Sequence, residues 1–158
     1  MNQQLTLITS IIIFLFFLFP SYSEGKNSFE KKEVLEITVY KSPSCGCCKK
    51  WEEYLTRNGF KVISYNKDNM NEIKNSFGVQ PHLQSCHTAS INGYVIEGHV
   101  PAEDIKKLLK EPKKNTIGLT APGMPKHSPG MQKQGKKPKG YNILSFKKDG
   151  SSQIFNKY

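Results

Sequence analysis

The sequence predicts an α/β domain in the order β-α-β-α-β-β-α, followed by a Pro/Gly/Lys-rich loop and a C-terminal β-hairpin. Short β-branched and apolar runs, typical of strands, alternate with segments whose apolar residues recur every three or four positions, typical of helices. The dipeptide Asn92-Gly93 between two of these runs is a strong hairpin signal. A chain of 158 residues is long enough for one such domain and too short for two of ordinary size.

The first half of the domain is predicted to hold two strands and two helices. The first strand is expected over residues 34–40, which are apolar and β-branched. Ser44 stands where a helix cap is expected, and the helix behind it carries Leu55 on its apolar face. A second strand over residues 60–65 and a short helix over residues 68–77 follow.

The second half begins with a hairpin and closes with a helix. The third strand is expected around residues 83–91, and the Asn-Gly turn leads into the fourth strand over residues 94–98. Pro101 stands at the first turn of the last helix, where its missing N–H is tolerated. This order is that of a thioredoxin-like fold, in which a proline such as Pro81 precedes the third strand.

The N-terminus predicts export. An apolar run from Leu5 to Phe19 is ended by Pro20, and small residues follow at Ser21 and Ser23. Its unbroken apolar core is shorter than the roughly 20 residues that a membrane-spanning helix needs. We therefore expect a cleaved signal peptide and an exported, periplasmic protein with no stable membrane anchor.

The remaining boundaries follow from composition. Residues 1–23 are predicted to be the signal peptide and residues 24–33 a flexible lead-in. Residues 34–158 form the single domain, in which 111–140 is a long loop and 141–158 a hairpin. The formal net charge of +10 could suit nucleic acid or an anionic lipid surface. Export argues against nucleic acid, and the lysines gather in the C-terminal third instead of on one helix face, so we interpret most of them as solvated surface.

Three of the four cysteines lie within Cys45-Gly46-Cys47-Cys48, between the first strand and the first helix. This cluster has two interpretations. Cys45 and Cys48 have the spacing of a redox pair, with Cys45 as nucleophile and Cys48 as resolving thiol. The three sulfurs together form a thiolate cluster of the kind that soft metals prefer. A helix N-terminus favours the thiolate in both cases. A third interpretation, structural disulfides, leaves the close spacing without a reason.

Other soft donors lie further along the chain. Cys86 and His87 are expected beside the cluster, although strand alternation sends their side chains to opposite faces unless the strand is bulged or frayed. Met124 and Met131 lie in a polar loop, where their thioethers could bind Cu(I) or simply pin the loop to the domain. For His99, just before a helix, capping or packing is favoured over ligation.

Four motifs together resemble the DUF411 family of small exported bacterial proteins, which are described as metal-binding and associated with copper. The motifs are Cys45-Gly46-Cys47-Cys48-Lys49-x-Trp51, Ser85-Cys86-His87-Thr88-Ala89, Gly93-Tyr94-Val95-Ile96-Glu97-Gly98-His99-Val100-Pro101-Ala102 and Pro122-Gly123-Met124-Pro125-x-x-Ser128-Pro129-Gly130-Met131. The resemblance implies a thioredoxin-like fold and a metal role for Cys45, Cys47, Cys48 and Cys86, and more loosely for His87, Met124 and Met131. The family usually has Gly-Val-Pro before the third strand, whereas Gln80 intervenes here.

The leading hypothesis is a periplasmic binding protein for a soft metal, Cu(I) above all, that acts in copper buffering, transfer or resistance. Zinc is the second metal that the ligands allow. The expected partners are the metal ion and a copper-exporting or copper-accepting protein. On this hypothesis the protein is not an enzyme. The alternative is a thiol–disulfide oxidoreductase that uses Cys45 and Cys48, against which stands Cys47, a third thiol that would compete in exchange.

Overall fold

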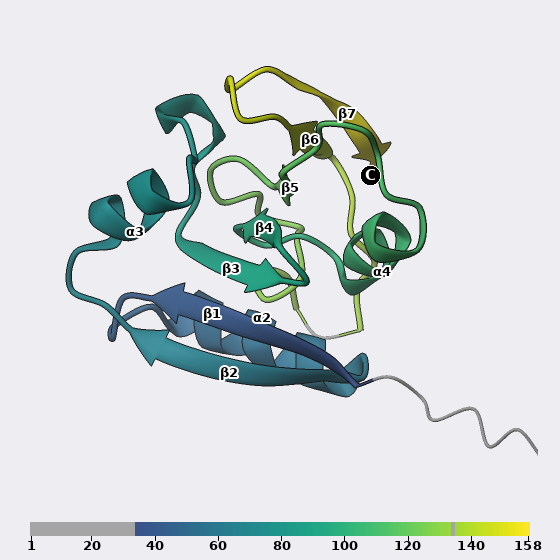
Figure 1. Ribbon diagram of the computed structural model, residues 1–158. Helices are drawn as coiled ribbons and strands as arrows, with labels where there is room; N and C mark the ends of the chain where they lie inside the picture. The colour runs from purple at the N-terminus through teal and green to yellow at the C-terminus, as the bar shows by residue number, and fades with distance from the viewer. Residues whose placement is uncertain (1–33, 134) are drawn as a thin grey trace, which may run out of the picture. The chain divides into compact units, whose positions relative to one another are not determined.

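The computed structural model describes residues 34–133 and 135–158, so the expected signal peptide and lead-in lie outside the described residues. Three helices and a seven-stranded sheet make up this part of the chain (Figure 1). In chain order the elements are β1 (Leu35–Lys41), α2 (Gly46–Arg57), β2 (Phe60–Asn66), α3 (Met70–Ser76), a 3₁₀ turn (Pro81–Leu83), β3 (His87–Ile91), β4 (Tyr94–Glu97), α4 (Ala102–Lys110), β5 (Gly118–Thr120), β6 (Asn142–Phe146) and β7 (Ser152–Lys157).

The strands follow one another in the order β2-β1-β3-β4-β5-β6-β7. β1 pairs in parallel with β2, and β4 with β5, while the other neighbours are antiparallel. A parallel pair needs a crossover, and α2 provides it between β1 and β2. The α/β class, the predicted element order and the closing hairpin are confirmed. That the arrangement is specifically thioredoxin-like stays a prediction.

The sheet has an apolar cluster on each face. One cluster contains Trp51 of α2 and Ile105 of α4 together with Ile96 of β4. The other contains Val95 of β4 and Leu83 of the 3₁₀ turn. Because successive side chains of a strand point to opposite faces, neighbouring β4 residues in different clusters place the clusters on opposite sides of the sheet.

Two local predictions were wrong. The third strand begins at His87 instead of Leu83, because Pro81 starts a 3₁₀ turn that ends at Leu83. The loop expected over residues 111–140 contains a fully buried strand, β5, which joins β4 to β6. Gly118 allows this pairing, since a Cβ there would lie 2.0 Å from the backbone oxygen of Val95.

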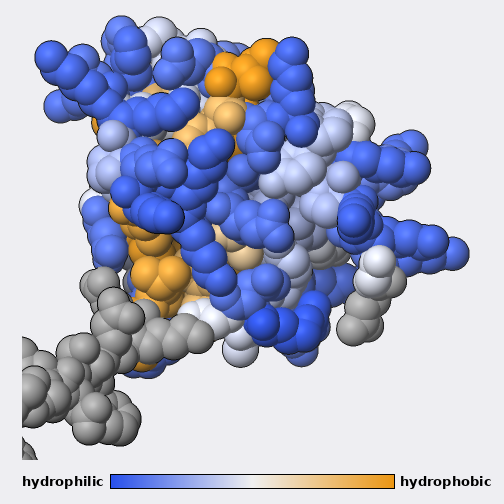
Figure 2. All heavy atoms as spheres, turned by 90° about the vertical axis from the view of Figure 1, so that its right-hand side faces the viewer, coloured by the Kyte–Doolittle hydropathy of each residue, from blue (hydrophilic) through white to orange (hydrophobic). Residues whose placement is uncertain are grey.

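The face turned toward the right of Figure 1 is covered mainly by hydrophilic side chains, with apolar groups in separate patches (Figure 2). This distribution agrees with the interpretation of most lysines as solvated surface. No helix in the described ranges, 34–133 and 135–158, is long and apolar enough to cross a membrane.

Candidate metal centre

The four cysteines meet at the N-terminus of α2. Cys45 is the N-cap of this helix, and Cys47 and Cys48 lie in its first turn. Cys86 approaches from the segment just before β3. The Sγ atoms of all four lie within 4.8 Å of one another. The sequence-based prediction that Cys86 lies beside the cluster therefore matches the geometry.

The sulfurs of Cys45, Cys47 and Cys48 are carried by the N-cap and first turn of α2, where the first backbone N–H groups have no partner within the helix. The predicted cap at Ser44 is wrong, because the hydroxyl of Ser44 pairs with that of Ser42 and Cys45 is the N-cap without a side-chain capping bond. The first turn also carries no acidic side chain. The positive end of the helix dipole is therefore left to stabilise thiolates.

Two of the sulfurs are joined. Cys45 and Cys48 form a disulfide with a Cα–Cα separation of 5.3 Å, whereas Cys47 and Cys86 are free. The Sγ of Cys47 lies 3.6 Å from that of Cys45. Reduction of the disulfide by two electrons and two protons gives four thiols in one place, so the same cluster can present a disulfide or a set of soft ligands.

A second group of ligand atoms shares Cys86. The Sγ of Cys86 lies 3.3 Å from Nδ1 of His87 and 3.0 Å from Nε2 of His99, and the three side chains form a potential metal-binding group. Alternation does not separate Cys86 from His87, because β3 begins at His87 and Cys86 lies in a bend outside the strand. The strand is therefore frayed at its start, which is the condition expected from the sequence for Cys86 and His87 to bind one metal.

His99 is the site residue that the sequence interpretation missed. Its Nδ1–H donates to the backbone oxygen of Pro129 at 2.7 Å, which leaves the lone pair of Nε2 directed at Cys86. Metal-binding histidines are typically oriented by such a bond from their other ring nitrogen. The Asn92-Gly93 turn contained the information that places His99. The turn pairs Ile91 with Tyr94, and the same antiparallel register, extended beyond the ends of β3 and β4, sets His99 opposite Cys86.

Burial controls the protonation of this group. Burial, and then the negative charge of Cys47, raise the pKa of the Cys86 thiol to about 12. Burial also lowers the pKa of His87 well below its usual value, with His99 and Lys74 adding to the effect. The pKa of His99 is lowered by burial against the opposing bond to Pro129. Without metal, the side chains of Cys86, His87 and His99 are therefore uncharged at neutral pH. A metal that binds the sulfur must displace the proton of Cys86.

Aromatic and backbone contacts fix the two imidazoles. The ring of Trp51 lies 4.3 Å from that of His87, and its Nε1–H donates to the oxygen of Val100. Gly130 lies directly against the first turns of α2, because a Cβ on it would stand 2.8 Å from the nitrogen of Trp51 and 3.0 Å from the oxygen of Cys47. The Pro129–Gly130 segment thus links α2 to His99.

A buried ion pair supports the segment that carries Cys86. Lys74 of α3 pairs with Glu97 of β4, and both side chains are almost fully buried. The carboxylate of Glu97 also accepts the backbone N–H of Ser85 and the hydroxyl of Thr88. Since these residues flank Cys86 and His87, the pair fixes the backbone on both sides of them.

The two methionines have different surroundings. Met124 is 59% exposed, and its neighbour Gly123 accepts a hydrogen bond from the Ser85 hydroxyl, one residue before Cys86. Met131 is partly buried, one residue after Gly130. Their loop therefore lies beside the cysteine segment, while ligation by either thioether stays a prediction.

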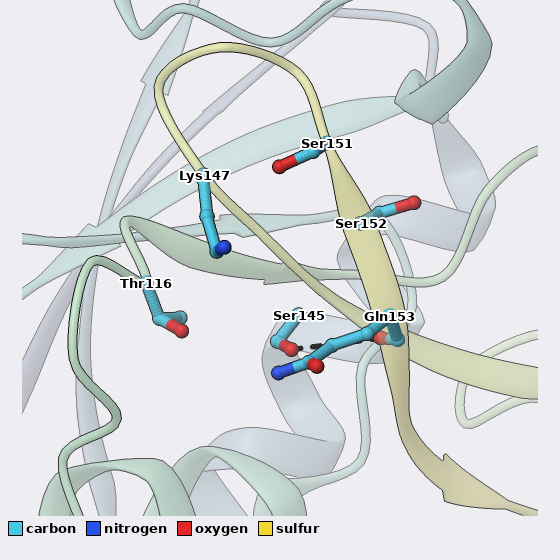
Figure 3. A pocket seen from close by; sticks show the side chains of 6 residues that line it. All are labelled: Thr116, Ser145, Lys147, Ser151, Ser152 and Gln153. Atoms are coloured by element: carbon cyan, nitrogen blue, oxygen red, sulfur yellow. Dashed lines mark hydrogen bonds between the residues drawn. The ribbon is translucent and has the colours of Figure 1, made fainter.

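A small pocket elsewhere in the domain has different chemistry. It has a volume of about 160 Å³ and is lined by hydroxyl, amide and amine groups from β6, β7, the turn between them and the segment before β5 (Figure 3). Its lining residues are Thr116, Ser145, Lys147, Ser151, Ser152 and Gln153. It offers no thiol, imidazole or thioether, so the soft-metal chemistry belongs to the cysteine site.

Comparison with known proteins assigns the family. A family model described as "Protein of unknown function, DUF411" matches residues 83–131. Two solved structures, both named copper resistance protein CopG (form 1 and form 2), are each 39% identical in sequence with a TM-score of 0.73. The alignments cover 80% of this chain and 99% or 98% of the CopG chains. The chain belongs to the DUF411 family. The residues matched by the DUF411 model include Cys86, His87 and His99. No curated protein matches the sequence.

Proposed function

We propose that this protein is an exported copper-binding protein that holds Cu(I) and serves in copper buffering, transfer or resistance. The observation that carries the proposal is the set of four cysteine sulfurs within 4.8 Å of one another. Thiolates are the ligands that Cu(I) prefers. The similarity to structures named copper resistance protein supports copper as the metal.

The ligands on this proposal come from both groups. Cys45, Cys47 and Cys48 provide thiolates from the N-cap and first turn of α2, and Cys86 with His99 completes the site from the β3–β4 side. Because Cys86 belongs to both groups, its sulfur can serve either one or bridge two ions. His87 adds a further imidazole against the same sulfur.

Met124 and Met131 are proposed to complete or shield the site as thioether donors. Zinc, which takes thiolate and imidazole in a tetrahedron, is the competing metal. We further propose a periplasmic location, based on the N-terminal apolar run followed by Pro20. The partners would be a copper-exporting or copper-accepting protein, and the role would be binding instead of catalysis.

The disulfide between Cys45 and Cys48 favours a second candidate, a thiol–disulfide oxidoreductase. In that reaction the Cys45 thiolate attacks a substrate disulfide, a mixed disulfide forms, and Cys48 displaces the second substrate thiol. The protein is oxidised by two electrons and the substrate is reduced by two. Cys47 has no part in this exchange.

Anaerobic titration of the reduced protein, residues 24–158, with Cu(I) against a competing chelator tests the proposal, with Zn(II) in parallel. We expect tight, saturable Cu(I) binding that Cys47→Ser weakens. Weak binding of both metals, together with rapid reduction of a test disulfide, would establish the oxidoreductase instead. In that case Cys47→Ser should reduce the test disulfide as fast as the unaltered protein does.

Matched variants resolve the remaining ligands. His99→Ala should lower Cu(I) affinity, while His82→Ala, at an exposed position, should leave it unchanged. Met124→Leu and Met131→Leu test the thioethers against Met70→Leu in α3, which makes the same change in side chain away from the loop. Equal affinities in all three methionine variants would remove the thioethers from the ligand set.

A further inference from the structure

A basic cleft lies beside the metal site and has no part in holding the metal. It has a volume of about 560 Å³, with the outer face of α2 on one side and, on the other, residues from Pro129 to Lys133 together with Gly135 and Lys136. Lys50, Glu53 and Arg57 line the helix side, at spacings of three and four residues that share one helix face. Lys133 and Lys136 line the opposite side of the cleft.

Among the described residues that line this cleft, basic side chains outnumber acidic ones. Lys50, Arg57, Lys133 and Lys136 face one acidic side chain, Glu53. In the part of the chain that the structure describes, ion pairs join only Lys61 with Glu36 and Lys74 with Glu97. The cleft cations are therefore available to an external anion. Lys50 and Arg57 on the helix side and Lys133 and Lys136 on the other form two rows of cations, and a cleft between such rows focuses the positive potential.

The cleft and the metal site share a wall. The oxygen of Pro129 accepts the Nδ1–H of His99, and Gly130 packs against the backbone of Cys47 and Trp51. Pro129 and Gly130 also line the cleft. A ligand in the cleft would consequently lie on the segment that orients His99, which places it next to any group that delivers or receives metal.

We propose that this cleft docks an acidic peptide segment of the protein that exchanges metal with the cysteine site. The inference rests on the proposed function for the identity of that partner. Lys50 and Arg57 are two helical turns apart, about 10.5 Å along the axis. An extended chain covers that distance in about three residues, so separated carboxylates on a peptide match the two rows of cations better than one compact anion does.

Binding of a labelled, acetylated hexaglutamate peptide to the metal-free protein, followed by fluorescence anisotropy at low ionic strength, tests the proposal. The double variant Lys50→Glu/Lys133→Glu should weaken binding by about tenfold or more, since each reversal converts an attraction into a repulsion. Lys110→Glu/Lys114→Glu is the matched control: it makes the same change in net charge at exposed positions outside the cleft. We expect a change of less than about twofold there, through screened long-range charge alone.

Three results would overturn the proposal: no binding by the unaltered protein, an equal loss in the cleft variant and the control, or equally strong competition by inorganic phosphate. The last result would assign the cleft to small anions. Cu(I) affinity of the cleft variant should equal that of the unaltered protein, because its side chains supply no ligand. Peptide binding without Cu(I) binding would refute the proposed function and leave the docking site standing.

Discussion

Gly130→Ala tests whether the loop positions the metal site. Gly130 has φ +84°, a conformation that costs an L-residue about 1–2 kcal/mol. The new Cβ would also stand 2.8 Å from the nitrogen of Trp51. Since its nearest neighbours are backbone atoms, the loop must move, and overpacking of this kind costs about 1–3 kcal/mol. We expect the two effects together to lower the free energy of unfolding by about 2–5 kcal/mol.

The same movement withdraws the oxygen of Pro129 from Nδ1 of His99. Loss of a bond that orients a metal-binding histidine typically costs 10–100-fold in affinity. We therefore expect Cu(I) affinity to fall by about that factor, measured by chelator competition on reduced protein that urea unfolding has shown to be folded.

Gly140→Ala is the matched control, because Gly140 has φ +75° and a Cβ added to it would have no atom within 4 Å. It should lose about 1–2 kcal/mol of stability and keep its Cu(I) affinity. Undiminished Cu(I) affinity in Gly130→Ala would refute the positioning argument. An equal loss of affinity in both variants would trace the effect to global destabilisation.

Three further predictions concern residues around the site. Removal of one partner of the buried pair, by Lys74→Met or Glu97→Gln, should lower the free energy of unfolding in urea by about 3–5 kcal/mol, because the other charge is left buried and unpaired. The double variant should recover part of this loss, and fully additive losses would contradict the coupling. The pKa of Cys86 is about 12, and only the thiolate is alkylated, so its alkylation rate should rise about tenfold per pH unit between pH 7 and 10. Mass spectrometry can follow this rate, and a plateau near pH 9 would contradict the raised pKa. Cu(I) should quench Trp51, the only tryptophan, through its contact with His87, and unchanged emission at saturation would place the metal elsewhere.

The sequence predicted the parts of the site that local patterns determine. The spacing of Cys45, Cys47 and Cys48 and the helix that follows them are local, so their position at a helix N-terminus could be derived directly. The placement of Cys86 followed from strand order. His99 was missed because its position before a helix was weighed locally, whereas the hairpin register sets it opposite Cys86.

Other features depend on contacts that no local pattern encodes. β5 has only three residues, too few for a period to show, and its place in the sheet depends on the close approach of Gly118 to Val95. The docking of Gly130 on α2 likewise depends on the absence of a Cβ at one point of a Pro/Gly-rich loop. Composition predicted that a loop was there, and only the tertiary structure shows which surface it covers.

The same loop segment connects the two functions proposed for this molecule. On its inner side Pro129 holds His99 toward Cys86, and on its outer side Pro129 and Gly130 form a wall of the basic cleft. A peptide that binds the cleft and shifts this wall would change the orientation of His99, and metal binding at His99 would in turn stabilise one position of the wall. Because such coupling is reciprocal, the affinity for the acidic peptide and the affinity for Cu(I) should change each other by the same factor.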